Sequence, residues 1–230
     1  TLARGAGVTV PSPEVVDDLP DGRMELAQHA SPTLRVILQE MLLYSTNLTA
    51  EVCGLAATQA KMRASLDIKA SAAQMTRWIG ETYGVECGFT DHSGLSDENR
   101  IRASAMVKLL LAVQQDGDLR PILRRIAMRD SDNKRIENYP IEVRAKTGTL
   151  NFVSALAGYV ETAGASDVVF AIFAADLDRR ARGQAAGDEV PAGSIEWNRR
   201  AKRLQQVLLQ RWGLTHTDNQ PFSQGVDIDT

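Results

Sequence analysis

Two short polar motifs in this sequence hold side chains that could carry out acyl transfer. The first is Ser45-Thr46-Asn47, and the second is Lys146-Thr147-Gly148-Thr149. A lysine supplies a fixed cation, a hydroxyl can relay a proton or bind a terminal carboxylate, and an amide can bind a substrate amide. A glycine directly after Lys-Thr lets a substrate backbone approach a strand edge that a Cβ would obstruct. The two motifs are therefore candidate parts of one catalytic site.

Each motif alone also has a structural explanation. Ser45 and Asn47 fit a helix C-terminus followed by a new helix cap, and residues 146–149 fit a strand that ends in a glycine turn. Together and in this order, they match the S-x-N and K-T-G boxes of serine acyl-transfer enzymes that act on penicillin or on D-Ala-D-Ala. The pair therefore favours catalysis more strongly than either motif does alone.

An amphipathic helix is expected to deliver the first motif. Ser31 is a good N-cap for this helix, and Pro32 suits its first position. Apolar residues recur at i, i+3, i+4, i+7 and i+8, which predicts a buried stripe that ends by placing the Ser45 hydroxyl on the inward face. A helix rich in small residues is predicted from Leu48 to about Met62. The stripe consists of Leu34, Ile37, Leu38, Met41 and Leu42.

Between the two motifs, the sequence predicts three more helices and a turn-rich segment. The first helix spans about Ser71 to Tyr83, and the segment CGFTDHSGLSDENR follows it. Ser96 is expected to cap the next helix, which runs to about Gln115 and stops at Gly117. A shorter helix and the charged loop RDSDNKRIEN complete this region. That shorter helix presents Leu119, Ile122, Leu123 and Ile126.

The pattern changes to a period of two before the second motif. Ile141, Val143 and Ala145 alternate with polar residues, which predicts a half-buried strand that leads into Lys146. Residues 155–162 and 168–176 are expected to form two further strands. Because the last strand is almost wholly apolar, we expect it to be central in the sheet.

The remaining segments complete a fold of the α+β class. Residues 179–193 are expected to form a polar loop, and a final helix is predicted from Ser194, its cap, to Gly213, where it ends. The first thirty residues suggest loops and an edge strand, and the tail after Thr215 an irregular extension. The predicted order is helices, then an antiparallel meander of three strands, then a covering helix. That helix aligns Trp197, Ala201, Leu204, Leu208 and Trp212.

Three longer segments extend the match beyond the two boxes. They are HASPTLRVILQEMLLYSTNLTAE, DHSGLSDENR and KTGTLNFVSALAGYV, in that order. Over most of Val8 to Trp212, the sequence resembles class C low-molecular-mass penicillin-binding proteins, the D-alanyl-D-alanine carboxypeptidases/endopeptidases. The resemblance implies a penicillin-binding-protein/β-lactamase-like transpeptidase fold. Residues 1–214 would be the C-terminal part of the penicillin-binding domain, and residues 215–230 would be an irregular tail.

The resemblance also implies a role for each site residue. Ser45 would pass protons between the nucleophile region and the leaving amine, and Asn47 would bind the substrate amide and help place a general-base lysine. Lys146 would supply positive potential and polarise the Ser45 hydroxyl. Thr147 and Thr149 would bind the terminal carboxylate beside Gly148, with the Thr149 N–H as half of an oxyanion hole. The turn around Ser93 is interpreted as structural, with Asp91 bracing its loop and His92 not required for catalysis.

One required motif of this family is missing before S-x-N. The acylated serine and the base lysine belong to an S-x-x-K box, yet the S-x-x-K match in this sequence, Ser131 to Lys134, comes after S-x-N in a charged loop. The same residues spell S-D-N, and we interpret both matches as chance. The nucleophile is therefore expected in an upstream half of the same protein, and this chain alone is expected to be inactive.

Composition and charge exclude several other classes. The 230-residue chain is 43% hydrophobic and 24% charged, enough for one large domain or two small ones with a core. The net charge is -3 without a basic block, so nucleic-acid binding has no electrostatic support. The longest apolar run, Val168 to Ala175, is too short to span a membrane, and no signal peptide is evident at the start. The spacing of histidines and cysteines predicts no metal site, and we expect no cofactor.

Partners and alternatives follow from the resemblance. The expected ligands are peptidoglycan stem peptides ending in D-Ala-D-Ala, with β-lactams as inhibitors, and the expected location is the bacterial periplasm, with or without a loose membrane association. A β-lactamase or related esterase is one alternative, and a non-catalytic peptidoglycan-binding remnant is another. Cys53 and Cys87 are equally compatible with a disulfide and with two buried thiols.

Overall fold

A computed structural model describes residues 2–9, 15, 17, 22, 27–162 and 167–215 of the chain. The chain divides into two compact units, Thr1–Pro32 and Thr33–Thr230. The first contains a short helix, α1 (Leu2–Gly5), where loops and an edge strand are predicted. The other described residues up to 30 form no helix or strand, in accord with loops, while the remaining residues of this segment and the irregular tail lie outside the described residues. The assignment of residues 1–214 to one domain stays a prediction.

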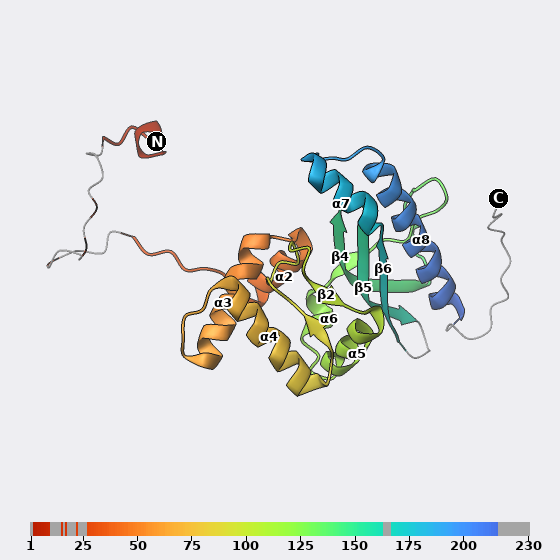
Figure 1. The fold of residues 1–230 in the computed structure, drawn as a ribbon, viewed down its shortest axis with the longest axis horizontal. Helices are drawn as coiled ribbons and strands as arrows, with labels where there is room; N and C mark the ends of the chain where they lie inside the picture. The colour runs from red at the N-terminus through yellow and green to blue at the C-terminus, as the bar shows by residue number, and fades with distance from the viewer. Residues whose placement is uncertain are drawn as a thin grey trace. The chain divides into compact units, whose positions relative to one another are not determined.

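The second unit is an α+β fold, as predicted (Figure 1). A helical part precedes a sheet whose strands run antiparallel in the order β3-β4-β5-β6. A small two-stranded ladder joins β1 to β2. The elements are α2 (Leu34–Tyr44), α3 (Asn47–Met62), α4 (Ile68–Tyr83), β1 (Cys87–Gly88), β2 (Arg100–Ile101), α5 (Ala103–Gln114), α6 (Leu119–Ile122), β3 (Arg124–Ile126), β4 (Ile141–Leu150), β5 (Val153–Thr162), β6 (Val168–Ala175), α7 (Leu177–Ala186) and α8 (Ser194–Thr215).

The alternation along β4 explains the two layers of the core. Its odd-numbered residues as far as Ala145, including Ile141 and Val143, are buried in a cluster that includes Leu209 of α8. The opposite face of the sheet carries Tyr159, which is fully buried against α5 and α6 and donates a hydrogen bond to Leu110 O at 2.9 Å. The sheet that carries the second motif is therefore held between helices on both faces.

The central place predicted for the last strand is wrong. β6 lies at an edge of the four-stranded sheet formed by the described residues. Its apolar composition has another cause, because α5 and α8 both contact this strand. A continuous apolar run indicates that both faces of a strand are covered, and this does not require a strand on each side.

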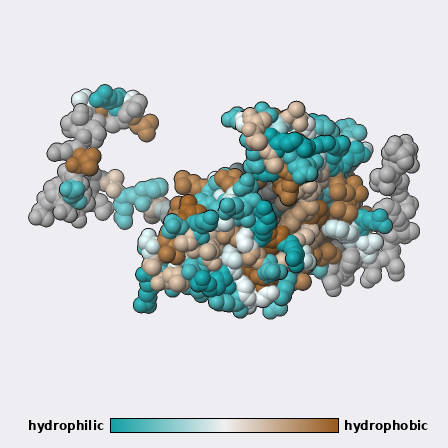
Figure 2. Space-filling model, in the orientation of Figure 1, coloured by the Kyte–Doolittle hydropathy of each residue, from teal (hydrophilic) through white to brown (hydrophobic). Residues whose placement is uncertain are grey.

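The amphipathic helix before Ser45 also differs from its prediction. It begins at Leu34 with Thr33 as its N-cap, not with Ser31 and Pro32, and none of its residues is buried. Figure 2 shows hydrophobic surface over this helix, in which Leu34 and Leu43 are 63% and 36% exposed. The stripe predicted to be buried is only half-buried: Leu34 is exposed, and the other four residues are partly covered, with Leu42 packed against the cluster around Tyr159.

Side-chain caps move several other boundaries. Asp67 caps α4 by accepting from Ala70 N at 2.7 Å, so this helix begins before the predicted Ser71. Ser96 does not cap a helix: residues 97–99 lie in a turn, β2 follows, and α5 begins only at Ala103. The predicted shorter helix stops at Ile122, and Ile126 belongs to β3.

The predicted polar loop over residues 179–193 is largely helix α7. Asp176 caps it by accepting from Arg179 N at 3.0 Å. Gly183, which suggested a loop, lies inside the helix, and a Cβ there would be 2.4 Å from Cγ of Pro191. This glycine therefore permits close packing and does not mark a turn.

The C-terminal helix contains a second glycine of this kind. Gly213 was predicted to end the helix, but α8 continues to Thr215, and the glycine faces the sheet. The buried side of α8 is displaced from the predicted one, and Leu204 is 52% exposed. The buried residues are Ser194, Ala201, Gln205, Leu209 and Gly213.

Replacing Gly213 by alanine is expected to lower the free energy of unfolding by about 1–3 kcal/mol, because the extra methyl group must displace a core side chain. The added Cβ would lie 2.6 Å from Cδ1 of Ile141. Urea unfolding measures the change. Gly80→Ala in α4 is the matched control, since its nearest neighbour, Val85 O, is 3.9 Å away. An equal effect of the two substitutions would contradict this close contact.

Candidate active site

The two polar motifs meet through one direct contact. The Lys146 Nζ atom donates a hydrogen bond to Ser45 Oγ at 2.5 Å, across 101 positions of sequence. It also donates to its neighbour's carbonyl, Thr147 O, at 2.5 Å. The fold therefore brings a lysine and a serine hydroxyl into hydrogen-bonding contact at the junction of the helical part and the sheet.

A sharp change of chain direction positions the serine. Ser45 follows the last residue of α2 in the left-handed conformation, with φ 55°, and its N–H bonds to Met41 O. Thr46 is extended, and Asn47 begins α3. Ser45 was predicted to face inward as the end of a buried stripe, but it is exposed and reaches Lys146 because it has left the helix. Asn47 is exposed, and its side chain makes no hydrogen bond with the described residues.

The second motif lies along an open strand edge. β3 pairs with β4 only from Val143 to Ala145, so residues 146–150 have no strand beside them on that edge among the residues described. Thr147 is half-buried, and Gly148 and Thr149 are exposed. A Cβ on Gly148 would meet Ala155 Cβ at an ordinary 3.5 Å. The chain's own packing therefore does not demand glycine here, and the open edge could pair with an extended peptide.

Hydrogen bonds from the C-terminal part hold the end of this strand. Asn198 of α8 donates to Leu150 O at 3.0 Å, and Asn151 in the β4–β5 turn donates to Glu189 O at 2.8 Å. Gln205 donates to the buried Ser154 hydroxyl at 3.1 Å. The strand that carries Lys146 is thus a fixed support, although Asn198 and Gln205 gave no sign of this in the sequence.

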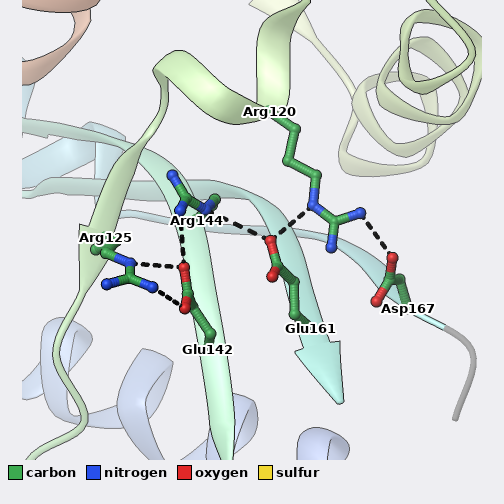
Figure 3. A network of polar contacts seen from close by, with 6 residues as sticks. All are labelled: Arg120, Arg125, Glu142, Arg144, Glu161 and Asp167. Atoms are coloured by element: carbon green, nitrogen blue, oxygen red, sulfur yellow. Dashed lines mark hydrogen bonds and ion pairs between the residues drawn. The ribbon is translucent and has the colours of Figure 1, made fainter. Parts of the chain in front are cut away.

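An ion network fixes the other end of the same strand pair (Figure 3). Three arginines and three carboxylates from α6, β3, β4, β5 and the segment before β6 alternate across the sheet, with N–O distances that include 2.7 Å for Arg120–Glu161 and 2.6 Å for Arg120–Asp167. The three positive and three negative charges of the network balance. The neighbouring Arg124 is not part of it and has no carboxylate partner among the described residues. The network consists of Arg120, Arg125, Glu142, Arg144, Glu161 and Asp167.

The site has a positive potential. Burial is the main cause that lowers the pKa of Lys146, and the nearby Arg124 cation lowers it further. No ion pair joins Lys146 to a carboxylate among the residues that the structure describes. A cation pair beside an open strand edge suits an anionic group such as a peptide carboxylate. Sequence reasoning missed Arg124, because only the pairing of β3 with β4 brings it near Lys146.

Other residues of chemical interest lie outside this contact. Ser131 is exposed in a turn in which Lys134 N donates to Asp130 Oδ1 at 2.8 Å, in accord with a chance S-x-x-K match. His92 bonds to Ser71 and touches neither motif. Cys53 and Cys87 are free thiols. Within the described ranges, no helix is both long and apolar enough to cross a bilayer.

The helical part beside an antiparallel sheet with a C-terminal covering helix defines the penicillin-binding-protein class of fold. The sequence model of the D-Ala-D-Ala carboxypeptidase 3 (S13) family matches residues 2–192, and the chain belongs to this family. No curated protein matches the chain.

Solved structures agree with this fold. Penicillin-binding protein 4 from Haemophilus influenzae, complexed with a β-lactam, is 20% identical with a TM-score of 0.57, over 89% of this chain and 48% of that one. A penicillin G-acylated predatory endopeptidase from Bdellovibrio bacteriovorus is 16% identical with a TM-score of 0.53, over 83% and 48%. A second Bdellovibrio predatory endopeptidase, bound to an immunity protein, is 18% identical with a TM-score of 0.52, over 96% and 57%. The chain spans about half the length of the solved structures that it matches.

Proposed function

We propose that this chain forms one wall of the acyl-transfer site in a serine-type D-Ala-D-Ala carboxypeptidase/endopeptidase that acts on peptidoglycan stem peptides. The observation that carries the proposal is the 2.5 Å contact between Lys146 Nζ and Ser45 Oγ, beside an open strand edge. Membership of the S13 family supports the same activity. The β-lactam complex and the penicillin G-acylated structure among the relatives support an acyl-enzyme route.

The exposed edge of β4 binds the end of the substrate in this proposal. The terminal D-Ala carboxylate accepts hydrogen bonds from the hydroxyls of Thr147 and Thr149 in the positive field of Lys146. Gly148 lets the peptide backbone lie against the strand, and the Thr149 N–H provides half of the oxyanion hole. The exposure of Gly148 and Thr149 on an unpaired edge supports this placement.

Ser45 and Asn47 act on the scissile amide from the opposite side. The Asn47 side chain binds the substrate amide and helps to place the base lysine. Ser45, polarised by Lys146, passes a proton to the departing D-Ala amine when the C–N bond breaks and the acyl-enzyme forms. Water then hydrolyses the ester, which returns the serine nucleophile to its free form.

The nucleophile and its base come from a segment that carries an S-x-x-K box, in an upstream half of the same protein. That segment covers exposed apolar side chains near Ser45, such as Leu48 at 78% exposure. The chain alone is inactive in this proposal because Ser45 and Lys146 relay and stabilise charge but do not form the acyl bond. The periplasm is the expected location, since the substrate is peptidoglycan.

Labelling with a fluorescent penicillin tests the proposed function. The full-length gene product is expected to form a long-lived acyl-enzyme and to release D-Ala from a D-Ala-D-Ala peptide, while the present chain alone stays unlabelled. Rapid penicillin turnover would indicate a β-lactamase instead. Binding of the peptide without D-Ala release would indicate a non-catalytic remnant, and a folded full-length protein that takes up no penicillin would refute the proposal.

As the pH is raised, the acylation rate is expected to fall at a pH below the usual pKa range of lysine. Burial and Arg124 lower the pKa of Lys146. Because the cation is the active form, activity is present below this pKa and is lost as the pH rises through it. Arg124→Ala removes one of the two causes, so the fall should move to higher pH. Arg135→Ala, which removes the partner of Glu137, is the control and should leave the pH of the fall unchanged. If the rate of the Arg124→Ala variant also falls at an unchanged pH, this interpretation is contradicted.

A further inference from the structure

One carboxylate on α3 binds the backbone of a turn that is distant in sequence. Glu51 lies one helical turn after Asn47, and its two oxygens accept His92 N at 3.1 and 3.3 Å and Ser93 N at 3.0 Å. Hydrogen bonds from backbone N–H groups to a carboxylate are among the stronger ones in proteins. Both oxygens of Glu51 therefore hold the turn around Ser93, which lies in the segment DHSGLSDENR.

This turn is held together by its own hydrogen bonds. Asp91 accepts hydrogen bonds from Gly94 N at 2.8 Å, Ser96 N at 2.6 Å and the Asn99 side chain at 2.7 Å. Burial by itself raises the pKa of Asp91, but these hydrogen bonds, that from Asn99 first, outweigh it and hold the pKa below the usual range. The predicted bracing role of Asp91 is confirmed by these bonds. Glu51 is thus attached to a loop that has hydrogen bonds of its own.

A second contact fixes the turn to the same helix. The His92 ring lies directly against Gly54, where a Cβ would come within 2.1 Å of the ring. His92 Nε2 and the fully buried Ser71 hydroxyl of α4 are 2.8 Å apart, and Ser71 donates to Thr58 Oγ1 at 2.8 Å. The turn therefore contacts α3 at two levels, at Glu51 and at Gly54, and it also holds α4.

Apart from the contact of Ser45 with Lys146, the N-terminus of α3 has little other support. Its N-cap, Thr46, makes no side-chain capping bond, and Thr46, Asn47 and Leu48 are exposed. α2, which precedes it, has no buried residue. In a helix, residues four apart lie on one face about one turn, or about 5.4 Å, from each other. The attachment at Glu51 therefore sets where the first turn of α3, and the Asn47 side chain on it, can lie.

We propose that Glu51 is a positioning residue for the acyl-transfer site. By binding the backbone of residues 92 and 93, Glu51 holds Asn47 in place. The inference rests on the proposed function only for its catalytic consequence. Glu51 does not act as an acid or base here, because both oxygens face N–H groups of the chain. Its effect passes through Asn47.

A double-mutant cycle in the full-length protein tests this coupling. Glu51→Ala is expected to slow penicillin acylation by about 10- to 100-fold, since small misplacements of a positioning group have effects of this size. Glu51→Gln, which retains an acceptor oxygen, should keep a rate within about 10-fold of the wild type. In the Asn47→Ala background, Glu51→Ala should have no further effect. Glu40→Ala on α2, an exposed glutamate, is the matched control. An unchanged rate in Glu51→Ala, or equal effects with and without Asn47, would overturn the proposal.

Hydrogen exchange separates failure of the positioning role from failure of the proposed function. Exchange in peptides covering residues 45–55 should be faster in Glu51→Ala than in Glu40→Ala, and close to wild type in Glu51→Gln. Equal exchange in all three variants would overturn the positioning role whatever the activity. Faster exchange in a protein that takes up no penicillin would support the positioning role and refute the proposed function. Should Glu51→Ala not fold, Glu51→Asp, whose shorter side chain withdraws the carboxylate from the turn, takes its place, and exchange equal to that of Glu40→Ala would overturn the positioning role.

Discussion

Replacing Lys146 by alanine is expected to abolish penicillin labelling of the full-length protein, with a loss of about 1,000-fold or more in acylation rate. The substitution removes the cation that contacts Ser45 at 2.5 Å and the main positive charge at the open edge of β4. Proton relay through Ser45 and binding of the substrate carboxylate both depend on the Lys146 cation, so both are lost. The rate of labelling by a fluorescent penicillin measures the effect, and thermal unfolding shows whether the variant is folded.

Lys134→Ala is the matched control for this substitution. Lys134 belongs to the other lysine motif, Ser131 to Lys134, which lies in an exposed turn. Labelling should be unchanged in this variant. Strong labelling of a folded Lys146→Ala protein would exclude the K-T-G assignment, and loss of labelling in Lys134→Ala would show that the S-x-x-K match there is not accidental.

Gly148→Ala is expected to reduce acylation by about 100-fold while leaving the fold intact, because the methyl group obstructs the edge along which the substrate backbone lies. The chain itself has room for this group: the nearest atom, Ala155 Cβ, is 3.5 Å from the added Cβ. The free energy of unfolding should change by less than about 1 kcal/mol, since alanine also reduces the freedom of the unfolded chain.

Gly88→Ala provides the control for a glycine in a strand away from the site. An added Cβ at Gly88 in β1 meets nothing within 4 Å, so both stability and labelling should stay close to wild type. Urea unfolding and labelling kinetics of the two variants separate obstruction of the edge from damage to the strand. If Gly148→Ala is labelled as fast as Gly88→Ala, substrate does not lie against residue 148.

Local sequence signals predicted much of this fold. The helix from Leu48 to Met62 and the half-buried strand before Lys146 agree with α3 and β4, because a period of 3.6 or of two is a property of neighbouring residues. The α+β class is also confirmed. The errors lie where a residue serves a distant contact: Gly183 and Gly213 suggested a loop and a helix end, yet each admits a side chain from another element.

The sequence alone determined which side chains could do chemistry here: the two boxes, their order and the family resemblance all depend on residue identity. Only the tertiary structure decided that Lys146 reaches Ser45, that Arg124 lies beside Lys146, and that Glu51 holds the turn that follows Asp91. These contacts depend on the pairing of β3 with β4 and on the packing of α2, α3 and the turn. Local periodicity does not contain that information, because it comes from residues far apart in the chain that share one packed interior.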